Sequence, residues 1–152
     1  KKAKAEGVHT NIDTCGAVFT REEPFFSKLE ELMKYTDMLM LDIKHIDDEQ
    51  HKILTGHSNK NILAMARELS DMKKPVWIRH VLVPDGSDKD EYLHRLADFI
   101  HTLSNVERVE VLPYHTLGKF KWENLGLPYP LEGVNPPTQE RIDNARKILG
   151  AI

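Results

Sequence analysis

The chain has 152 residues, of which 40% are hydrophobic and 30% charged, a composition typical of a globular protein with a core of its own. Its formal net charge of −3 argues against a basic nucleic-acid-binding surface, and no apolar run approaches the roughly 20 residues of a membrane-spanning helix. The single cysteine, Cys15, excludes an internal disulfide. With no signal peptide in view, a reducing, cytoplasmic setting is expected.

The first seven residues, KKAKAEG, predict the end of a helix. They are mostly helix formers, and Gly7 stands where a glycine commonly ends one. Neither an initiator Met nor a residue suited to cap the helix start is present. The sequence therefore predicts that this chain is part of a longer protein.

Four runs of strand-forming residues alternate with helical patterns along the chain. The predicted strands are Val8 to Asp13, Met38 to Ile43, Val76 to Val83 and Arg108 to Leu112. Apolar residues at helical spacing predict the helices between and after them. Their stripes are Phe26, Leu29, Leu32 and Met33; Ile62, Leu63, Ala66 and Leu69; Leu93, Leu96, Ala97, Ile100 and Leu103; and Ile142, Ala145, Ile148 and Leu149. Ser58 and Ser87 are the predicted caps of the second and third of these helices, and the last helix is predicted to begin near Thr138.

This alternation predicts an α/β fold, a parallel sheet with covering helices. Leu39, Met40, Leu41 and Ile43 predict a second strand buried on both faces. Four strands are too few to close a barrel of eight, which takes about 250 residues. We therefore expect a single domain over residues 1–152, either a small open sheet or an arc of a barrel. An arc would leave the first strand as an exposed edge, through which a dimer is expected.

Polar residues gather at the predicted C-terminal ends of the strands, where parallel α/β folds bind ligands. They are Asp13, Asp42, Lys44 and His115, and Arg79 lies in the middle of the third predicted strand. Each also has an ordinary structural interpretation. Asp13 suits a turn or a cap, Asp42 and Lys44 an ion pair on one face, Arg79 a brace for a carboxylate, and His115 a loop residue bonded to backbone. Their convergence at one edge of the sheet favours a binding site.

The remaining histidines point to no metal site. Eight histidines are present, but neither an H-E-x-x-H motif nor a Cys/His ligand spacing occurs. His94 and His101 are seven positions apart on a predicted helix, so a surface position is expected for both.

A long proline-rich segment between Leu112 and Thr138 has no clear secondary structure. Loops of this length are usually functional or disordered. In one interpretation, residues 119–122 of this segment form a lid or a docking surface. In the other interpretation the segment is a packed strap, with Trp122 and Tyr129 filling the edge of the core.

These segments resemble the pyruvate formate-lyase activating enzymes, a branch of the radical S-adenosylmethionine (SAM) enzymes. The similar stretches are GVHTNIDTCG, MLMLDIKHID, VWIRHVLVP, VEVLPYHTLGKFKW and GVNPPT, so nearly the whole chain is covered. The most specific is the LPYHxLGxxKW pattern at its distance behind WIRxVxVP. The resemblance implies the C-terminal four strands of a six-stranded partial (β/α)6 TIM-like barrel.

The resemblance also implies roles for the residues at the strand ends. The SAM-binding triplet of the family falls on Asp42, Ile43 and Lys44, its histidine on His115, and an arginine that lines the barrel on Arg79. Lys44 would face the SAM carboxylate and His115 the adenosine part. Asp13 and Asp42 resemble the side-chain ligands of a monovalent cation beside that carboxylate.

The family's [4Fe–4S] cluster motif, C-x-x-x-C-x-x-C, and its Gly-Gly-Glu motif are both absent from this sequence. A cluster needs cysteine thiolates, and Cys15 is alone, so we expect no catalytic residue on this chain and no activity from it alone. Two local departures stand out. Cys15 occupies a position where some relatives have Asn, and VPDGSD moves a glycine relative to the commoner VPG.

The implied whole enzyme is an oxidoreductase that uses SAM and a [4Fe–4S] cluster to generate a glycyl radical on pyruvate formate-lyase. Three alternatives stay open: an activase of another glycyl-radical enzyme, a non-catalytic barrel fragment that acts as a binding module, and a metal-dependent lyase that holds a divalent ion with Asp13, Asp42 and His115.

Overall fold

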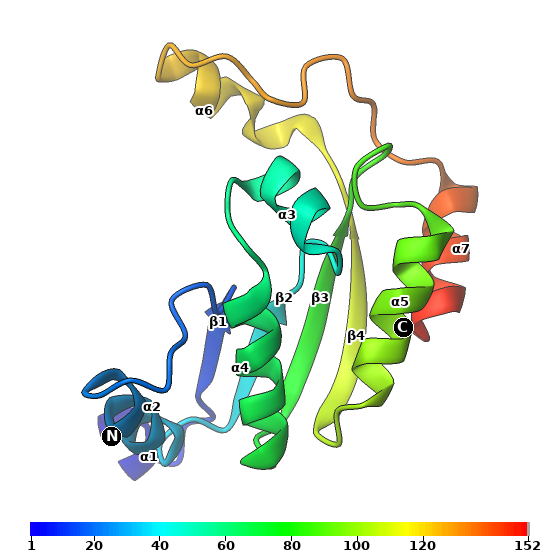
Figure 1. The fold of residues 1–152 in the computed structure, drawn as a ribbon. Helices are drawn as coiled ribbons and strands as arrows, with labels where there is room; N and C mark the ends of the chain where they lie inside the picture. The colour runs from blue at the N-terminus through cyan, green and yellow to red at the C-terminus, as the bar shows by residue number, and fades with distance from the viewer. Residues whose placement is uncertain (152) are drawn as a thin grey trace.

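The computed structural model describes residues 1–151 and contains a four-stranded parallel sheet (Figure 1). The strands are β1 (Asn11–Thr14), β2 (Met38–Asp42), β3 (Val76–Leu82) and β4 (Val106–Pro113). They lie in sequence order, and each is parallel to its neighbour. The predicted α/β fold is thereby confirmed.

The first strand begins three residues later than the sequence predicts. Val8 is 53% exposed, and the backbone N–H of Thr10 donates to the carboxylate of Asp37 at 2.7 Å. The Thr10 hydroxyl also donates to the backbone oxygen of Tyr35 at 2.6 Å. These bonds give the polar groups of Thr10 side-chain and turn partners in addition to its carbonyl contact with the start of β2.

The helices of the described chain are α1 (Lys2–Ala5), α2 (Phe25–Met33), α3 (Asp48–Thr55), α4 (Lys60–Asp71), α5 (Asp90–His101), α6 (Lys119–Asn124) and α7 (Gln139–Leu149), with a 3-10 turn η1 (Thr116–Gly118). Every helix in residues 1–151 is too short or too polar to serve as a membrane-spanning segment. The prediction that residues 112–138 contain no element was wrong, because η1 and α6 lie there. The helix α3 was also not predicted.

The helix α3 has clear local causes. The Asp47 side chain accepts hydrogen bonds from the backbone N–H groups of Glu49 and Gln50, both at 3.2 Å, which caps the helix start. Gly56 ends the helix in the left-handed conformation, with φ of +79°, where a residue without a Cβ is favoured.

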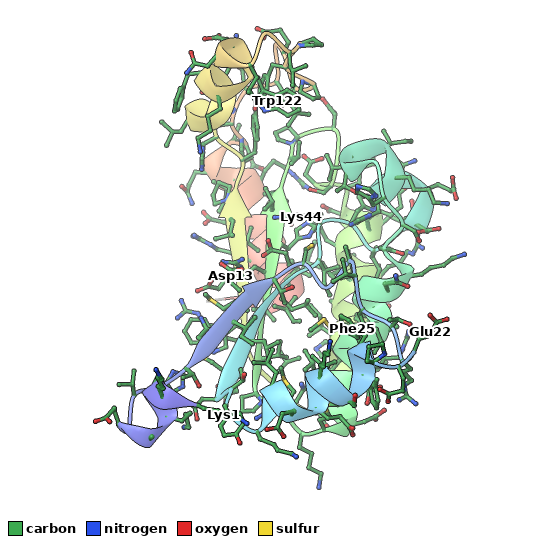
Figure 2. The ribbon with its side chains drawn as sticks, turned by 90° about the vertical axis from the view of Figure 1, so that its left-hand side faces the viewer. Lys1, Asp13, Glu22, Phe25, Lys44 and Trp122 are labelled. Atoms are coloured by element: carbon green, nitrogen blue, oxygen red, sulfur yellow. The ribbon has the colours of Figure 1, made fainter. Side chains whose placement is uncertain are left out.

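The helices cover only one face of the sheet, which curves as an arc. Along β2 the burial alternates, with Leu39 and Leu41 fully buried and Met38, Met40 and Asp42 half-buried. The buried strand residues form one core with the buried faces of α2, α4, α5 and α7. In Figure 2 helices α3, α4 and α5 lie to the right of the strands. The prediction that β2 is buried on both faces was therefore wrong, because no helix within residues 1–151 covers the Met40 side.

The predicted cap at Ser87 was also wrong. The helix α5 begins at Asp90, three residues later. Ser87 is fully buried, and its hydroxyl accepts from the Val83 N–H at 3.0 Å and donates to the Val81 carbonyl at 2.6 Å. Ser87 therefore closes the loop between β3 and α5.

The other caps and turns agree better with the sequence. Thr138 caps α7 by accepting from the Arg141 N–H at 3.3 Å, and Ser58 accepts from the Lys60 N–H at 3.2 Å, although Asn59 occupies the cap position of α4. Gly7 follows α1 with φ of +73°, as expected of a helix stop.

Candidate functional site at the strand ends

A chain of charged side chains runs across the uncovered face, from the C-terminal ends of β1 and β2 to the middle of β3. The Asp42 carboxylate accepts from Arg79 Nε at 2.7 Å through Oδ1 and from Lys44 Nζ at 2.9 Å through Oδ2. The same arginine donates through Nη2 to Asp13. Figure 2 shows Asp13 at the end of β1 and Lys44 beyond the end of β2.

The sheet register explains this arrangement. Asp42 lies opposite Arg79 in the pairing of β2 with β3, and facing residues of neighbouring strands point to the same side. Lys44 is two positions beyond Asp42 and so shares its face. The alternation that places Leu41 and Ile43 in the core thus places the acid and the base on the open side.

The network is charge-balanced and partly shielded. The side chains of Arg79 and Asp42 are each 16% exposed, Lys44 is 31% exposed and Asp13 is 54% exposed. Two carboxylates face two cations, so no charge is left without a partner as solvent is withdrawn. Both structural interpretations hold: Asp42 and Lys44 form an ion pair, and Arg79 braces two carboxylates.

The geometry bears on the two ion sites considered for these residues. The Arg79 guanidinium bonds to both Asp13 and Asp42, so it stands where a monovalent cation between those carboxylates would compete with it. Within residues 1–151 no three His, Cys, Asp or Glu side chains are arranged to hold a metal ion. The lyase alternative, which needs Asp13, Asp42 and His115 around a divalent ion, therefore gains no support.

The other two predicted residues lie apart from this network. The Ile43 side chain is fully buried; its N–H donates to the Arg79 carbonyl at 3.0 Å, and its own carbonyl accepts from His80 Nδ1 at 2.9 Å. Both polar backbone groups of Ile43 are therefore engaged, and only the second lone pair of its carbonyl oxygen is left for a ligand. His115 follows β4 and is exposed; the backbone bond predicted for it is not found among the described contacts.

The sequence did not reveal a group of buried polar side chains behind the end of β2. Of the seven buried polar or charged residues described, five gather there: His45, His51, Asn59, His80 and Ser87. Burial is the main cause that lowers the pKa of His45 to about 4, and burial also lowers the pKa of His80. Both imidazoles are therefore neutral at pH 7. The available signal was strand alternation, which puts His45 and His80 on the face opposite to Asp42 and Arg79.

A cavity of about 880 Å³ adjoins Lys44. Its walls come from α3, from residues 83–86, from Trp122 of α6 and from the segment that follows α6, including Tyr129. The Tyr129 hydroxyl bonds to that of Tyr114 at 2.7 Å, and the Trp122 ring packs edge-on against Tyr129 at 6.1 Å. Trp122 is nonetheless 37% exposed, so a lid or docking role for this segment stays a prediction.

The parallel arc and its strand-end site define the class of protein. A family model described as the radical SAM superfamily matches residues 1–99, which include the whole charged network. The chain belongs to this superfamily.

Its relatives include named activating enzymes. The chain is 58% identical over 147 residues to the pyruvate formate-lyase-activating enzyme of Streptococcus mutans, covering 97% of this chain and 56% of that protein. It is 54% identical to the enzyme of the same name from Staphylococcus epidermidis, covering 98% of this chain and 59% of that one. The chain thus spans a little over half the length of these relatives.

Solved structures agree on the fold. A crystal structure of a domain of pyruvate-formate lyase-activating enzyme from Bacteroides vulgatus superposes with a TM-score of 0.77 at 22% identity, covering 99% of this chain and 80% of that one. A radical SAM methyltransferase from Sphaerobacter thermophilus gives a TM-score of 0.63 at 19% identity, covering 95% of this chain and 39% of that one.

Proposed function

We propose that this chain is the C-terminal, SAM-binding portion of a pyruvate formate-lyase-activating enzyme. The observation that carries the proposal is the Asp13–Arg79–Asp42–Lys44 network, which joins the ends of β1 and β2 to the middle of β3. The 58% identity to a protein of that name supports the same conclusion. The resident cofactors are then SAM and a [4Fe–4S] cluster, and the partner is pyruvate formate-lyase.

The charged network fits SAM, which carries a carboxylate, an ammonium and a sulfonium. Lys44 is the more exposed cation of the network, so it can turn from Asp42 to the SAM carboxylate. Asp42 keeps Arg79 as its partner when Lys44 leaves, so no bare carboxylate results. The exposed imidazole of His115 is free to meet the adenosine part, and Ile43 contributes through its backbone.

The chemistry of the reaction needs more than this chain. One cysteine cannot supply the thiolates of a [4Fe–4S] cluster, so these 152 residues bind and orient but do not catalyse. When bound, SAM and the reduced cluster supply the radical that removes hydrogen from a glycine of the partner. The chain's own residues hold the cofactor's charged groups at the rim of the sheet.

The proposal has three further parts, which concern the domain, the sheet edge and a bound cation. Residues 1–152 form one domain that works in the cytoplasm. The outer edge of β1 supports pairing with another chain segment or a second copy. A monovalent cation held by Asp13 and Asp42 requires Arg79 to move from between them.

A titration of the 152-residue chain with SAM tests the cofactor role. The NMR chemical shifts of the backbone amides report the binding. We expect shifts at residues 42–44 and 79, and their loss in Lys44→Ala. The matched control is Lys28→Ala, an exposed lysine of α2, which leaves the shifts unchanged. Shifts that persist in Lys44→Ala, or that spread over the helix-covered side, would overturn the assigned site.

The activating role is tested separately by placing this chain in the corresponding part of the Streptococcus mutans enzyme. With its cluster restored, the chimera is expected to generate a glycyl radical on pyruvate formate-lyase, read by electron paramagnetic resonance. Radical formation on a different glycyl-radical enzyme alone would instead select the alternative partner. No radical on either, with SAM bound, would leave the chain a binding module.

A further inference from the structure

The backbone that carries Asp42 and Lys44 is held from behind by buried polar side chains. Burying a polar group stabilises the fold only when its hydrogen bonds are made. Five of the seven described buried polar residues nevertheless lie behind this one strand end. This concentration indicates that the backbone of residues 43–46 is held in a defined position.

The first of these side chains is His80, which is 2% exposed. Its Nδ1 lies 2.9 Å from the carbonyl oxygen of Ile43, the residue between Asp42 and Lys44. Its Nε2 lies 3.2 Å from the carbonyl oxygen of Ser87, in the loop after β3. A neutral imidazole carries one N–H, and the shorter distance assigns it to Nδ1. His80 therefore fixes the carbonyl of the strand end.

The second is Asn59, which is also 2% exposed. Its side-chain amide donates to the carbonyl of His45 at 3.0 Å and to that of Ile46 at 2.8 Å. Its own backbone N–H donates to Asp48 at 3.0 Å, which anchors it to the start of α3. Asn59 and His80 together thus hold three carbonyls that flank Lys44.

We propose that His80 and Asn59 are positioning residues, which fix residues 43–46 so that Asp42 and Lys44 present their charges to SAM. The inference rests on the proposed function, since it concerns the same cofactor. Neither side chain reaches the uncovered face, so neither touches the cofactor. Their effect passes through the backbone, and a small displacement of a charged group at a binding site is enough to weaken binding.

The test compares variants that place a hydrogen-bond donor at different positions with a variant that removes the donor. In His80→Asn the amide nitrogen falls near the position of Nδ1 and reaches Ile43, whereas in His80→Gln it falls near Nε2 and reaches Ser87. Asn59→Asp keeps the side-chain shape and replaces the donor with an acceptor. The control is Thr36→Val, a buried threonine at the opposite end of the sheet whose hydroxyl donates to the Leu32 carbonyl at 3.0 Å.

We measure the dissociation constant for SAM and the thermal midpoint of each variant of the 152-residue chain. His80→Asn is expected to keep affinity within about threefold, while His80→Gln and Asn59→Asp weaken it by on the order of tenfold. Thr36→Val lowers the thermal midpoint and leaves affinity unchanged. Equal affinities for the Asn and Gln variants, or weakening in Thr36→Val as large as in His80→Gln, would overturn the positioning role. Absence of SAM binding by the wild type would instead overturn the proposed function.

Discussion

Asp42 is the shared partner of both cations at the site, accepting from Arg79 Nε at 2.7 Å and from Lys44 Nζ at 2.9 Å. Each of its oxygens serves one cation, so a change at either partner is felt by the other. Arg79 also bonds to Asp13 on the neighbouring strand. Asp42 and Arg79 together therefore connect β1, β2 and β3.

Removing the guanidinium should destabilise the fold measurably. In Arg79→Gln, Asp42 and Asp13 lose a shared cation, and Asp42 is only 16% exposed. We expect the free energy of unfolding to fall by about 1–3 kcal/mol, measured by urea denaturation. Added potassium should recover part of the loss, because the two carboxylates can then share an ion.

The control for this change is Arg108→Gln on the same face of the sheet. Arg108 pairs with Glu110 at 3.1 Å and is 36% exposed, so the loss should be below about 1 kcal/mol. Equal losses in the two variants would show that the Asp42 pairing carries no special weight.

Gly16, just after β1, is expected to tolerate no side chain. Its φ is +67°, and an added Cβ would lie 2.8 Å from Met65 Sδ and 3.3 Å from Leu41 Cδ1. Gly16→Ala should therefore lower the free energy of unfolding by about 1–3 kcal/mol. Gly118→Ala, where nothing lies within 4 Å, should change it by less than about 0.5 kcal/mol. A reversed order of the two losses in thermal melts contradicts this reasoning.

The sequence was sufficient for the sheet because each strand has a strong apolar signal. Strand alternation also placed Asp42 and Lys44 on one face. It did not tell which face the helices leave open, because Met38 and Met40 are as apolar as the core residues beside them. That information depends on tertiary contacts that a single strand does not contain.

The buried polar group behind β2 was harder to predict. Asn59 and His80 are separated by 21 positions, and their shared task is visible only when β3 and the start of α4 are in place. Eight histidines without a metal-ligand spacing gave no indication of this task. The helix α3 had a usable signal, since Asp47 precedes an acidic first turn and Gly56 follows.

The packing of the segment after β4 is expected to be stabilised by a hydrogen bond between two tyrosine hydroxyls. Tyr129→Phe removes the 2.7 Å bond to Tyr114, which is 6% exposed, so about 1 kcal/mol of stability should be lost. Burial and this bond raise the pKa of Tyr114 to about 12. An ultraviolet absorbance titration of the variant should therefore show one tyrosine ionising at lower pH. Tyr92→Phe, whose ring packs on His45 at 4.5 Å, should leave the Tyr114 titration unchanged.

Stability should fall as the solution is acidified below the ordinary histidine range. Burial lowers the pKa of His45 from 6.5 to about 4, so the unfolded chain takes up a proton at a pH where the folded chain does not. The stabilisation is complete above pH 6.5 and is lost as pH falls from 6.5 toward 4. Between pH 7 and pH 5 this histidine alone accounts for roughly 2 kcal/mol, measured by urea denaturation at each pH.

The variant His45→Asn isolates this contribution. Its side-chain oxygen can accept from the Asp47 N–H, as His45 Nδ1 does at 3.0 Å, but it does not titrate. The pH dependence should therefore flatten by the His45 share, leaving the part due to His80, whose pKa burial also lowers. His101→Gln removes an exposed histidine and should leave the dependence as in the wild type. An unchanged slope in His45→Asn would mean that His45 is protonated in the folded chain at pH 5.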